Sequence, residues 1–221
     1  MIITIDGPSA AGKGTVARLL ASRLGLRYVD TGALYRAVAW WLKERCLDPE
    51  EDEELRKAVA SCPLGVGWDE VGKMSVKCGS QDISEALRAE EIGMLASRIS
   101  ARRVIREYLW RIQRDMARAG QMVFEGRDTG SQVFPEAGFR FFLTASREER
   151  ARRRFLELKG RGVETSLEEV EEKMTLRDQQ DASRDLAPLK VPQGGHVIDT
   201  TGLTPTEVVD RMLEVIQARA R

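Results

Sequence analysis

Asparagine is absent from this chain, histidine occurs once and cysteine three times. Without asparagine there is no N-K-x-D motif, which excludes the guanine-recognition loop that switch GTPases carry. Cys46, Cys62 and Cys78 follow no C-x-x-C spacing, and with His196 as the one histidine they form no zinc-site pattern. We therefore expect reduced thiols, as in cytoplasmic proteins, and no metal held by the side chains.

Net charge and long apolar runs are also lacking. Lys and Arg together number 35, as do Asp and Glu, so the formal net charge is zero. This balance argues against a nucleic-acid polymer as a partner, because such binders carry a basic excess. No segment approaches the length of a membrane span, and no basic stretch precedes an apolar run at the N-terminus. We expect a cytoplasmic protein without a membrane partner.

The most informative feature that is present is a glycine-rich stretch directly behind the apolar segment 2–5. It matches G-x-x-x-x-G-K, a loop that follows a buried strand, opens a helix and surrounds phosphate oxygens with backbone N–H groups. Lys13 would reach the β- and γ-phosphates of a nucleotide. The phosphate-binding residues that the motif predicts are Gly7, Pro8, Ser9, Ala10, Ala11, Gly12, Lys13, Gly14 and Thr15.

The end of this motif indicates the class of protein. Gly14 follows Lys13 and the hydroxyl comes one residue later, at Thr15, which favours small-molecule kinases over switch GTPases and motors. The alternative is a glycine-rich turn without a ligand. Strand-forming residues before the loop argue against that alternative, as do the apolar residues that recur at helical spacing after it, namely Val16, Leu19, Leu20 and Leu24.

Five short apolar segments predict an α/β fold with a parallel sheet. Helical patterns separate them, so we expect five parallel strands with helices on both faces, the three-layer core of a P-loop kinase. Three capping boxes, Ser146-x-x-Glu149, Ser166-x-x-Glu169 and Thr204-x-x-Glu207, predict helix starts. The expected strands are 2–5, 27–29, 122–124, 139–143 and 196–198.

Two segments interrupt this alternation. Residues 64–68 and 74–78 with a polar turn at 69–72 predict a β-hairpin, between a helix over 31–46 and a helical stretch over 84–119. The glycines on either side of Arg161 suit a mobile lid between two charged helices. We expect a single domain with its core at about 1–35, 114–149 and 167–221, an insertion with a small antiparallel sheet at about 36–113, and a lid at about 150–166.

Arginines outside ordinary helix faces are candidates for phosphoryl transfer, because its transition state spreads negative charge over three oxygens. Arg127 follows the expected strand 122–124, at the carboxyl end where parallel sheets bind ligands. Arg36 lies one turn inside a helix that Asp30 would cap, and it could face a second phosphate. A surface turn without a ligand is the plainer alternative for the segment around Arg127.

Further charged residues lie in the expected lid and after it. Arg177, Asp181 and Arg184 fall on one helical face, for which a salt-bridged helix surface is the alternative interpretation. Most arginines before the lid glycines should point to solvent, although one or two could close over phosphates with Arg161. These are Arg150, Arg152, Arg153 and Arg154.

The motifs together resemble the bacterial cytidylate kinase family. They are G-P-S-A-A-G-K-G-T, D-T-G-A-L-Y-R, A-S-R followed by V-I-R-E, G-R-D-T-G, and R-D-x-x-D-x-x-R-x-x-A-P-L. They occur in the family's order, cover nearly the whole chain and include the hairpin insertion of the bacterial form. The resemblance implies phosphorylation of CMP and dCMP by ATP in a monomer whose partners are small-molecule nucleotides. It also implies Mg²⁺ held mainly by nucleotide phosphates and water.

The resemblance further implies roles for individual residues. Residues 7–15 would hold ATP, and the lid would be formed by 150–154 and Arg161. The charge of the transferred group would be stabilised by Lys13, Arg127, Arg161 and Arg184. The acceptor phosphate would be approached by Arg36, Arg127 and Arg184. The cytosine would be read by Ser97, Arg106 and Asp128, and the sugar by Arg177 and Asp181. The acceptor site would also include Thr31 and Tyr35.

Two positions depart from the family's pattern, and two alternatives stay open. Glu125 stands where many relatives have Asp, and Thr31 where some have Ser. Another small-molecule kinase, with UMP, AMP or shikimate as acceptor, is the nearest alternative. A P-loop regulatory NTPase is the other alternative, supported by the D-x-x-G match at 199–202, which lies far from the loop in the sequence.

Overall fold

The structure, a computed structural model, describes residues 1–47, 52–70, 72 and 74–220. It divides into two compact units. The first consists of Met1–Leu26 and Val123–Arg221, and the second of Arg27–Met122. Among the described residues no helix combines the length and the apolar character that crossing a membrane requires.

The larger sheet has five strands in the order β2-β6-β1-β7-β8. Their bounds are β1 Ile2–Asp6, β2 Arg27–Asp30, β6 Met122–Glu125, β7 Phe139–Thr144 and β8 His196–Asp199. β1 pairs in parallel with β7, with Asp6 opposite Phe142, and β7 pairs in parallel with β8. The predicted five-stranded parallel sheet is confirmed, and each strand is one residue longer than its apolar segment.

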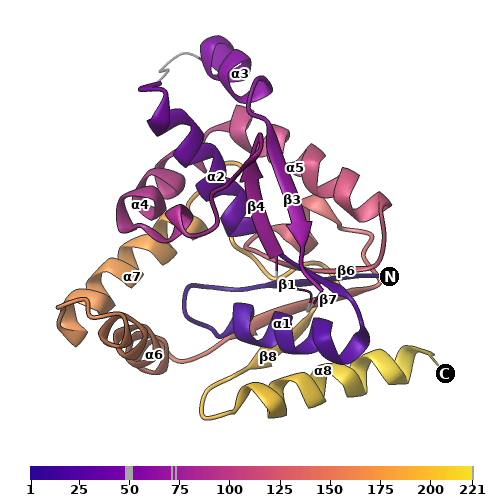
Figure 1. The fold of residues 1–221 in the computed structure, drawn as a ribbon. Coiled ribbons are helices and arrows are strands. Elements are labelled where there is room, and N and C mark those ends of the chain that lie inside the picture. The colour runs from indigo at the N-terminus through magenta and orange to yellow at the C-terminus, as the bar shows by residue number, and fades with distance from the viewer. Residues whose placement is uncertain (48–51, 71, 73, 221) are drawn as a thin grey trace. The chain divides into compact units, whose positions relative to one another are not determined.

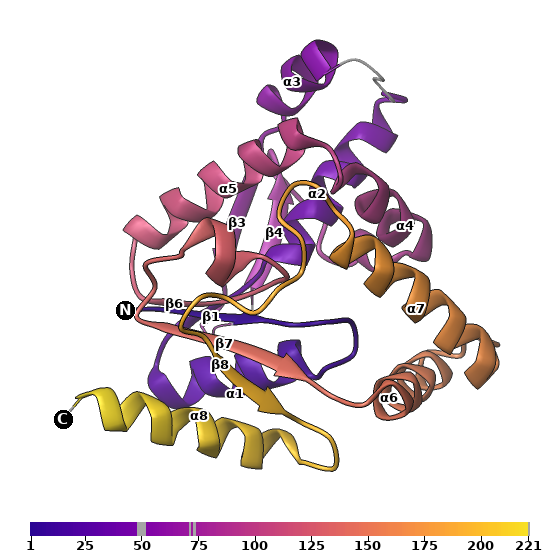
Figure 2. The same cartoon turned by 180° about the vertical axis from the view of Figure 1, so that it is seen from behind.

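In the first unit the helices are arranged in two pairs. α1 (Lys13–Leu24) packs beside α8 (Pro205–Ala220), and both lie on the same side of β1, β7 and β8 (Figures 1 and 2). α6 (Arg147–Gly160) and α7 (Leu167–Ala182) pack against each other as a second pair (Figure 2). Residues 161–166 connect α6 to α7, so the glycines around Arg161 separate two helices as predicted.

The predicted caps begin these helices. Ser146 accepts a hydrogen bond from the Glu149 N–H at the start of α6. Ser166 and Glu169 form a reciprocal capping box at the start of α7. Thr204 and Glu207 exchange hydrogen bonds before α8, whose first residue is Pro205. Each cap satisfies amide groups that the first helical turn leaves unpaired.

The second unit contains the predicted hairpin. β3 (Leu64–Trp68) pairs antiparallel with β4 (Met74–Cys78), with Leu64 opposite Cys78 and Trp68 opposite Met74. Val71, in the predicted turn, lies outside the described residues. A third strand that the sequence analysis missed, β5 (Gln81–Asp82), pairs with β4. Two residues are too short to show the alternation by which a strand is recognised in a sequence.

In the second unit the other helices pack around α2. The helices of this unit are α2 (Thr31–Glu44), α3 (Asp52–Ala60), a 3₁₀ turn η1 (Ala86–Arg88), α4 (Glu90–Ile99) and α5 (Arg103–Arg118). The expectation of one helical stretch over 84–119 is wrong, because residues 100–102 separate α4 from α5. The Ser100 carbonyl accepts a hydrogen bond from the Arg106 side chain at 2.7 Å, so a tertiary contact satisfies it where the helix stops.

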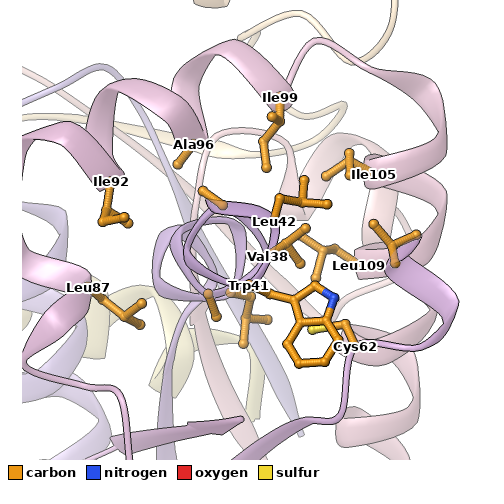
Figure 3. Packing of buried hydrophobic residues seen from close by; sticks show 14 of the residues in the cluster. Val38, Trp41, Leu42, Cys62, Leu87, Ile92, Ala96, Ile99, Ile105 and Leu109 are labelled. Atoms are coloured by element: carbon orange, nitrogen blue, oxygen red, sulfur yellow. The ribbon is translucent and has the colours of Figure 1, made fainter. Parts of the chain in front are cut away.

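A hydrophobic cluster holds the second unit together. Figure 3 shows Val38, Trp41 and Leu42 of α2 packed among side chains of α4 and α5, including Ile99 and Leu109. These side chains are almost completely buried. Burying a side chain of this size contributes about 1.5–3 kcal/mol. The cluster therefore fixes α2, whose first turns carry several predicted site residues.

Candidate active site

The glycine-rich loop, residues 7–12, connects β1 to α1 as the motif predicts. Gly7 has a φ of +148°, and a Cβ there would lie 2.0 Å from the Leu143 carbonyl oxygen. Gly12 has a φ of +84° and directly precedes the first helical residue, Lys13. L-residues with side chains rarely adopt these angles, so both glycines are required for the path of the loop.

Lys13 is buried among charged groups of the same unit. Its side chain turns back into the loop, and Nζ donates a hydrogen bond to the Pro8 carbonyl at 2.7 Å. Burial, and to a lesser degree the charge of Arg127, lowers the pKa of Lys13 to about 7. The carboxylates of Glu125 and Asp6 act in the opposite direction. A bound phosphate would supply the counter-charge that the buried ammonium group needs.

The pair of helices α6 and α7 contacts the loop at Ser9. Asp178 of α7 accepts a hydrogen bond from the Ser9 N–H at 3.3 Å. Arg150 of α6 donates to the Ser9 carbonyl at 3.2 Å and also pairs with Asp178. Sequence reasoning placed Arg150 near the lid but missed Asp178, because an acidic residue next to Arg177 reads as part of a solvated helix.

A second contact joins α6 to the loop through the segment after β8. Arg153 donates to the Thr200 side chain at 2.9 Å and to its carbonyl at 2.7 Å. The Thr200 hydroxyl in turn donates to the Ala11 carbonyl at 3.3 Å. Asp199 accepts hydrogen bonds from the backbone and hydroxyl of Thr201, which forms a local turn at the D-x-x-G match. Thr200 was also missed from the sequence.

Three of the predicted acceptor residues meet around one carboxylate. The Arg127 Nε–H donates to Asp181 Oδ2 at 3.0 Å, and Arg184 pairs with Asp181 Oδ1. The Asp181 side chain is only 2 % exposed, against 19 % for Arg127 and 12 % for Arg184. The two arginines are 57 residues apart in sequence, so the fold alone brings them together. Arg177 is exposed on α7.

The expectation that Arg177, Asp181 and Arg184 share one helical face is wrong for Arg184. α7 ends at Ala182 with Ser183 as its cap, so Arg184 lies beyond the helix. The Asp181 carbonyl accepts the Leu189 N–H at 2.8 Å, which holds the chain after the helix against its last turn. Arg184 still reaches Asp181, from a turn instead of a helix.

Asp128 lies one residue after Arg127 and is buried, at 5 % exposure. Its carbonyl accepts hydrogen bonds from the Gln132 and Val133 N–H groups. This opens a short π-helical turn, Thr129–Val133. Single π-helical turns are frequently found at functional sites.

In the second unit, Tyr35, Ser97 and Arg106 gather at the junction of α4 and α5. Arg106 is 1 % exposed; its Nε–H donates to the Ser100 carbonyl, and a terminal nitrogen lies 3.5 Å from the Tyr35 hydroxyl. The Ser100 hydroxyl donates to the Ser97 carbonyl at 2.7 Å. A buried guanidinium needs such partners, which fix its direction.

Asp30, Thr31 and Arg36 form a second group at the start of α2. Asp30 accepts the Ala33 N–H at 3.0 Å as the predicted cap, and it also pairs with Arg36 at 2.7 Å. A Cβ at Gly32 would lie 3.0 Å from Asp30 Oδ1 and 3.2 Å from an Arg36 nitrogen. The glycine therefore leaves room for the ion pair, and Thr31 is buried beside it as the first residue of the helix.

Arg161 is not gathered with the other arginines of its unit. It caps the end of α6 and pairs with Glu157 at 2.7 Å, with about half of its side chain exposed (52 %). Within the part of the chain that the structure describes, no group of three or more His, Cys, Asp or Glu side chains could hold a metal ion. Glu125 and Thr15, the residues nearest in sequence to a metal role, are half-buried and exposed respectively.

Comparison with known proteins decides the family. Residues 3–218 match the model of the family described as cytidylate kinase. A cytidylate kinase of Geobacter sulfurreducens is 44 % identical over 221 residues, which cover 100 % of this chain and 94 % of the relative. The chain belongs to the cytidylate kinase family. A second member, from Thermosipho melanesiensis, is 42 % identical over 219 residues, which cover 99 % of this chain and 98 % of the relative.

Solved structures confirm the fold. An uncharacterized protein from Eubacterium ventriosum matches with a TM-score of 0.55 at 12 % identity, covering 98 % of both chains. A protein from Thermus thermophilus matches with a TM-score of 0.51 at 19 % identity, covering 100 % of this chain and 98 % of the other. The relatives confirm the family resemblance predicted from the motifs. The two solved structures confirm the α/β fold.

Proposed function

We propose that this cytidylate kinase family member transfers the γ-phosphoryl group of ATP to CMP and dCMP. The observation that carries the proposal is the buried Lys13, folded back into a phosphate-binding loop with arginines of the same unit around it. A buried ammonium group beside guanidinium groups is costly unless an anion arrives. Family membership specifies the anions as a nucleoside triphosphate and a cytidine monophosphate.

On the donor side, residues 7–15 hold the triphosphate. The loop amides and Lys13 neutralise the oxygens that gain charge during transfer. Mg²⁺ bound with the nucleotide would neutralise part of the charge on the phosphate oxygens. The exposed Thr15 hydroxyl and the Glu125 carboxylate, which is close enough to raise the pKa of Lys13, are oxygen ligands of the type Mg²⁺ prefers. Most of its coordination would fall to phosphate and water, because the described side chains form no group of three or more acidic, His or Cys residues that could hold the ion.

On the acceptor side, Arg127 and Arg184 bind the phosphate of CMP, and Arg36 is the third arginine that we assign to acceptor binding. Asp181 holds Arg127 and Arg184 in one place before the nucleotide arrives, and with Arg177 it contacts the sugar. The attacking phosphate is already ionised at neutral pH, so the reaction needs no strong general base. Positioning and electrostatics therefore supply the rate.

Cytosine is distinguished from uracil by polarity. Asp128 accepts a hydrogen bond from the exocyclic amino group of cytosine, and Ser97 and Arg106 complete the recognition. Uracil presents a carbonyl oxygen in place of the amino group, so that two acceptors would face each other. Such a mismatch costs roughly 1–3 kcal/mol, or about ten- to a hundredfold in kcat/KM.

The remaining assignments concern the parts of the chain. We assign residues 1–35, 114–149 and 167–221 to the core, 36–113 to monophosphate binding and 150–166 to a lid. Arg161 would reach the transferred group when this lid closes, and closure would exclude water that otherwise hydrolyses ATP. Thr31 and Tyr35 belong to the monophosphate-binding side. We also propose that the protein acts as a monomer.

A coupled assay with CMP, dCMP, UMP, AMP and shikimate tests the function. We expect CMP and dCMP to be phosphorylated with the highest kcat/KM, and Asp128→Ala to reduce the preference for CMP over UMP by about ten- to a hundredfold. Substantial turnover of shikimate or AMP would contradict the proposed acceptor. Unchanged discrimination in Asp128→Ala would contradict the role of Asp128 while leaving the activity itself in place.

A further inference from the structure

Asp6, the last residue of β1, is a buried carboxylate that lies outside the roles described so far. It is 0 % exposed and directly precedes Gly7, where the donor loop begins. Its carboxylate accepts three hydrogen bonds from two consecutive residues that follow Asp128. They come from the Thr129 N–H at 3.0 Å, the Thr129 hydroxyl at 2.8 Å and the Gly130 N–H at 2.7 Å.

These hydrogen bonds are one of two anchors on the turn after β6. The other is the Gly126 N–H, which donates to the Ile5 carbonyl at 3.0 Å. The turn is thus attached to two consecutive residues of β1, at Gly126 before it and at Thr129 after it. Arg127 and Asp128 lie between the two anchors, so their backbone is held on both sides against β1.

The anchor at Asp6 requires an ionised carboxylate. All three neighbouring groups are donors, and only an ionised carboxylate accepts at both oxygens without presenting a proton. The pKa of Asp6 is raised to about 6: burial is the main cause and the charge of Asp128 contributes, while the hydrogen bonds from Gly130 and Thr129 offset part of the rise. Lys13, on the adjoining helix, is close enough for the Asp6 charge to act on it. The group is therefore ionised at neutral pH.

The backbone of the turn also packs directly on β1. A Cβ at Gly130 would lie 2.5 Å from the Thr4 hydroxyl oxygen and 3.3 Å from Asp6 Oδ2. Glycine is therefore the residue that lets the second amide reach the carboxylate. Thr4 and Asp6 project from the same face of the strand, since side chains alternate along it.

We propose that Asp6 is a positioning residue for the acceptor nucleotide: it fixes the backbone after Asp128 and so sets where the Arg127 and Asp128 side chains point. The inference rests on the proposed function, in which those two side chains contact CMP. Weakening the anchor therefore reduces the apparent affinity for CMP. ATP binding changes less, because Gly7 and the rest of the donor loop are held by their own backbone geometry.

The main experiment removes the single hydroxyl contact with Thr129→Val and restores it with Thr129→Ser. We expect Thr129→Val to raise the KM for CMP about three- to tenfold, the effect of one hydrogen bond, with the KM for ATP and kcat within about twofold of the parent. Thr129→Ser should return the KM for CMP to within about twofold, because serine keeps the hydroxyl donor.

Thr4→Val is the matched control. It makes the same chemical change two residues before Asp6, at a buried hydroxyl without a hydrogen-bond partner among the described residues. Its kinetic constants should stay at the parent values. Asp6→Asn is the stronger variant, because its amide NH₂ would face another donor; we expect the KM for CMP to rise about ten- to a hundredfold. Thr129→Val keeps the test valid if Asp6→Asn does not fold.

A readout without substrate completes the design. The Arg127 Nε–H, held by Asp181, gives a side-chain NMR signal that should shift in Thr129→Val and stay in place in Thr4→Val. An unshifted signal with unchanged KM for CMP, or equal increases in KM for CMP and ATP, overturns the proposal. Failure of the parent enzyme to phosphorylate CMP contradicts the proposed function instead, and the Arg127 signal then still decides the role of Asp6.

Discussion

The donor loop and the acceptor cluster of Arg127, Asp181 and Arg184 lie in the same unit but are built in opposite ways. The loop uses nine consecutive residues, and its shape depends on backbone angles at Gly7 and Gly12. The acceptor cluster joins the end of β6 to the end of α7, and Asp181 lies 54 positions after Arg127 in the sequence. The donor site is built from the backbone of one short segment. The acceptor site is built from side chains that pair across the fold.

The difference teaches where each site is sensitive. Substitutions other than to proline leave the backbone N–H groups in place, so the loop depends mainly on its glycines and on Lys13. The acceptor arginines depend on Asp181, which keeps two guanidinium groups together before an anion binds. A guanidinium group has five N–H donors, so each arginine can bind a phosphate while it stays paired with Asp181.

The largest expected effect is on the donor side. Lys13→Met removes the buried ammonium group, and we expect kcat to fall by about a hundred- to a thousandfold or more, as for loss of a preorganised transition-state contact. The fold should remain, because the free ammonium group is itself disfavoured by burial. Steady-state kinetics measure the fall in kcat, and circular dichroism measures whether the fold remains.

The same substitution at an exposed lysine, Lys57→Met, is the control and should leave activity unchanged. Lys57 lies on α3 of the second unit, with 75 % of its side chain exposed. Near-normal turnover in Lys13→Met would remove Lys13 from the mechanism.

Two aspartates one turn apart on α7 sharpen the comparison. Asp181→Asn should raise the KM for CMP about ten- to a hundredfold, because Arg127 and Arg184 lose their shared charged partner in a buried position. Asp178→Asn should raise the KM for ATP, since Arg150 loses the partner that holds it against the donor loop at Ser9. Kinetics with each substrate varied in turn measure both effects.

Each aspartate variant is the control for the other. The comparison predicts opposite patterns, with the change in KM confined to CMP in Asp181→Asn and to ATP in Asp178→Asn. If both variants raised the two KM values equally, the donor and acceptor regions would not be separable in this way.

The smallest expected effect is the uptake of a fraction of a proton when ATP binds. Free Lys13 has a pKa of about 7, below its usual 10.5, so it loses its proton as the pH rises above about 7. Bound phosphate restores the charged form, so ATP binding above this pH should take up a fraction of a proton and weaken as the pH increases. Calorimetry at pH 8 in two buffers of different ionisation enthalpy measures the uptake.

Lys13→Met is the control for this measurement as well. It should abolish the proton uptake, whatever remains of ATP binding. Equal uptake in parent and variant would assign the proton to another group.

The sequence predicted the elements of this protein better than the connections between them. Local features did this work: apolar segments marked the five parallel strands, capping residues marked the starts of α6, α7 and α8, and the hairpin β3–β4 was visible from its turn. β5 was missed because it has two residues, and the break between α4 and α5 because a tertiary contact of Arg106 satisfies the chain there.

The site divides along the same line. The loop was predicted residue by residue, because its function lies in consecutive backbone groups. Asp6 and Asp178 were missed because an acidic residue at a strand end or on a charged helix has no pattern of its own. Their roles follow from hydrogen bonds to Thr129 and Ser9, which are distant in sequence.

The amino-acid sequence by itself determined the order of the functional motifs along the chain. A phosphate-binding loop comes first, an arginine follows β6, and a second arginine group follows α7. The sequence also determined the family, because these motifs fall in order over nearly the whole chain. Only the tertiary structure decided which charges meet. Arg127 joins Arg184 through Asp181, and Asp6 anchors the turn that carries Arg127, because burial forces each charged group to find a partner.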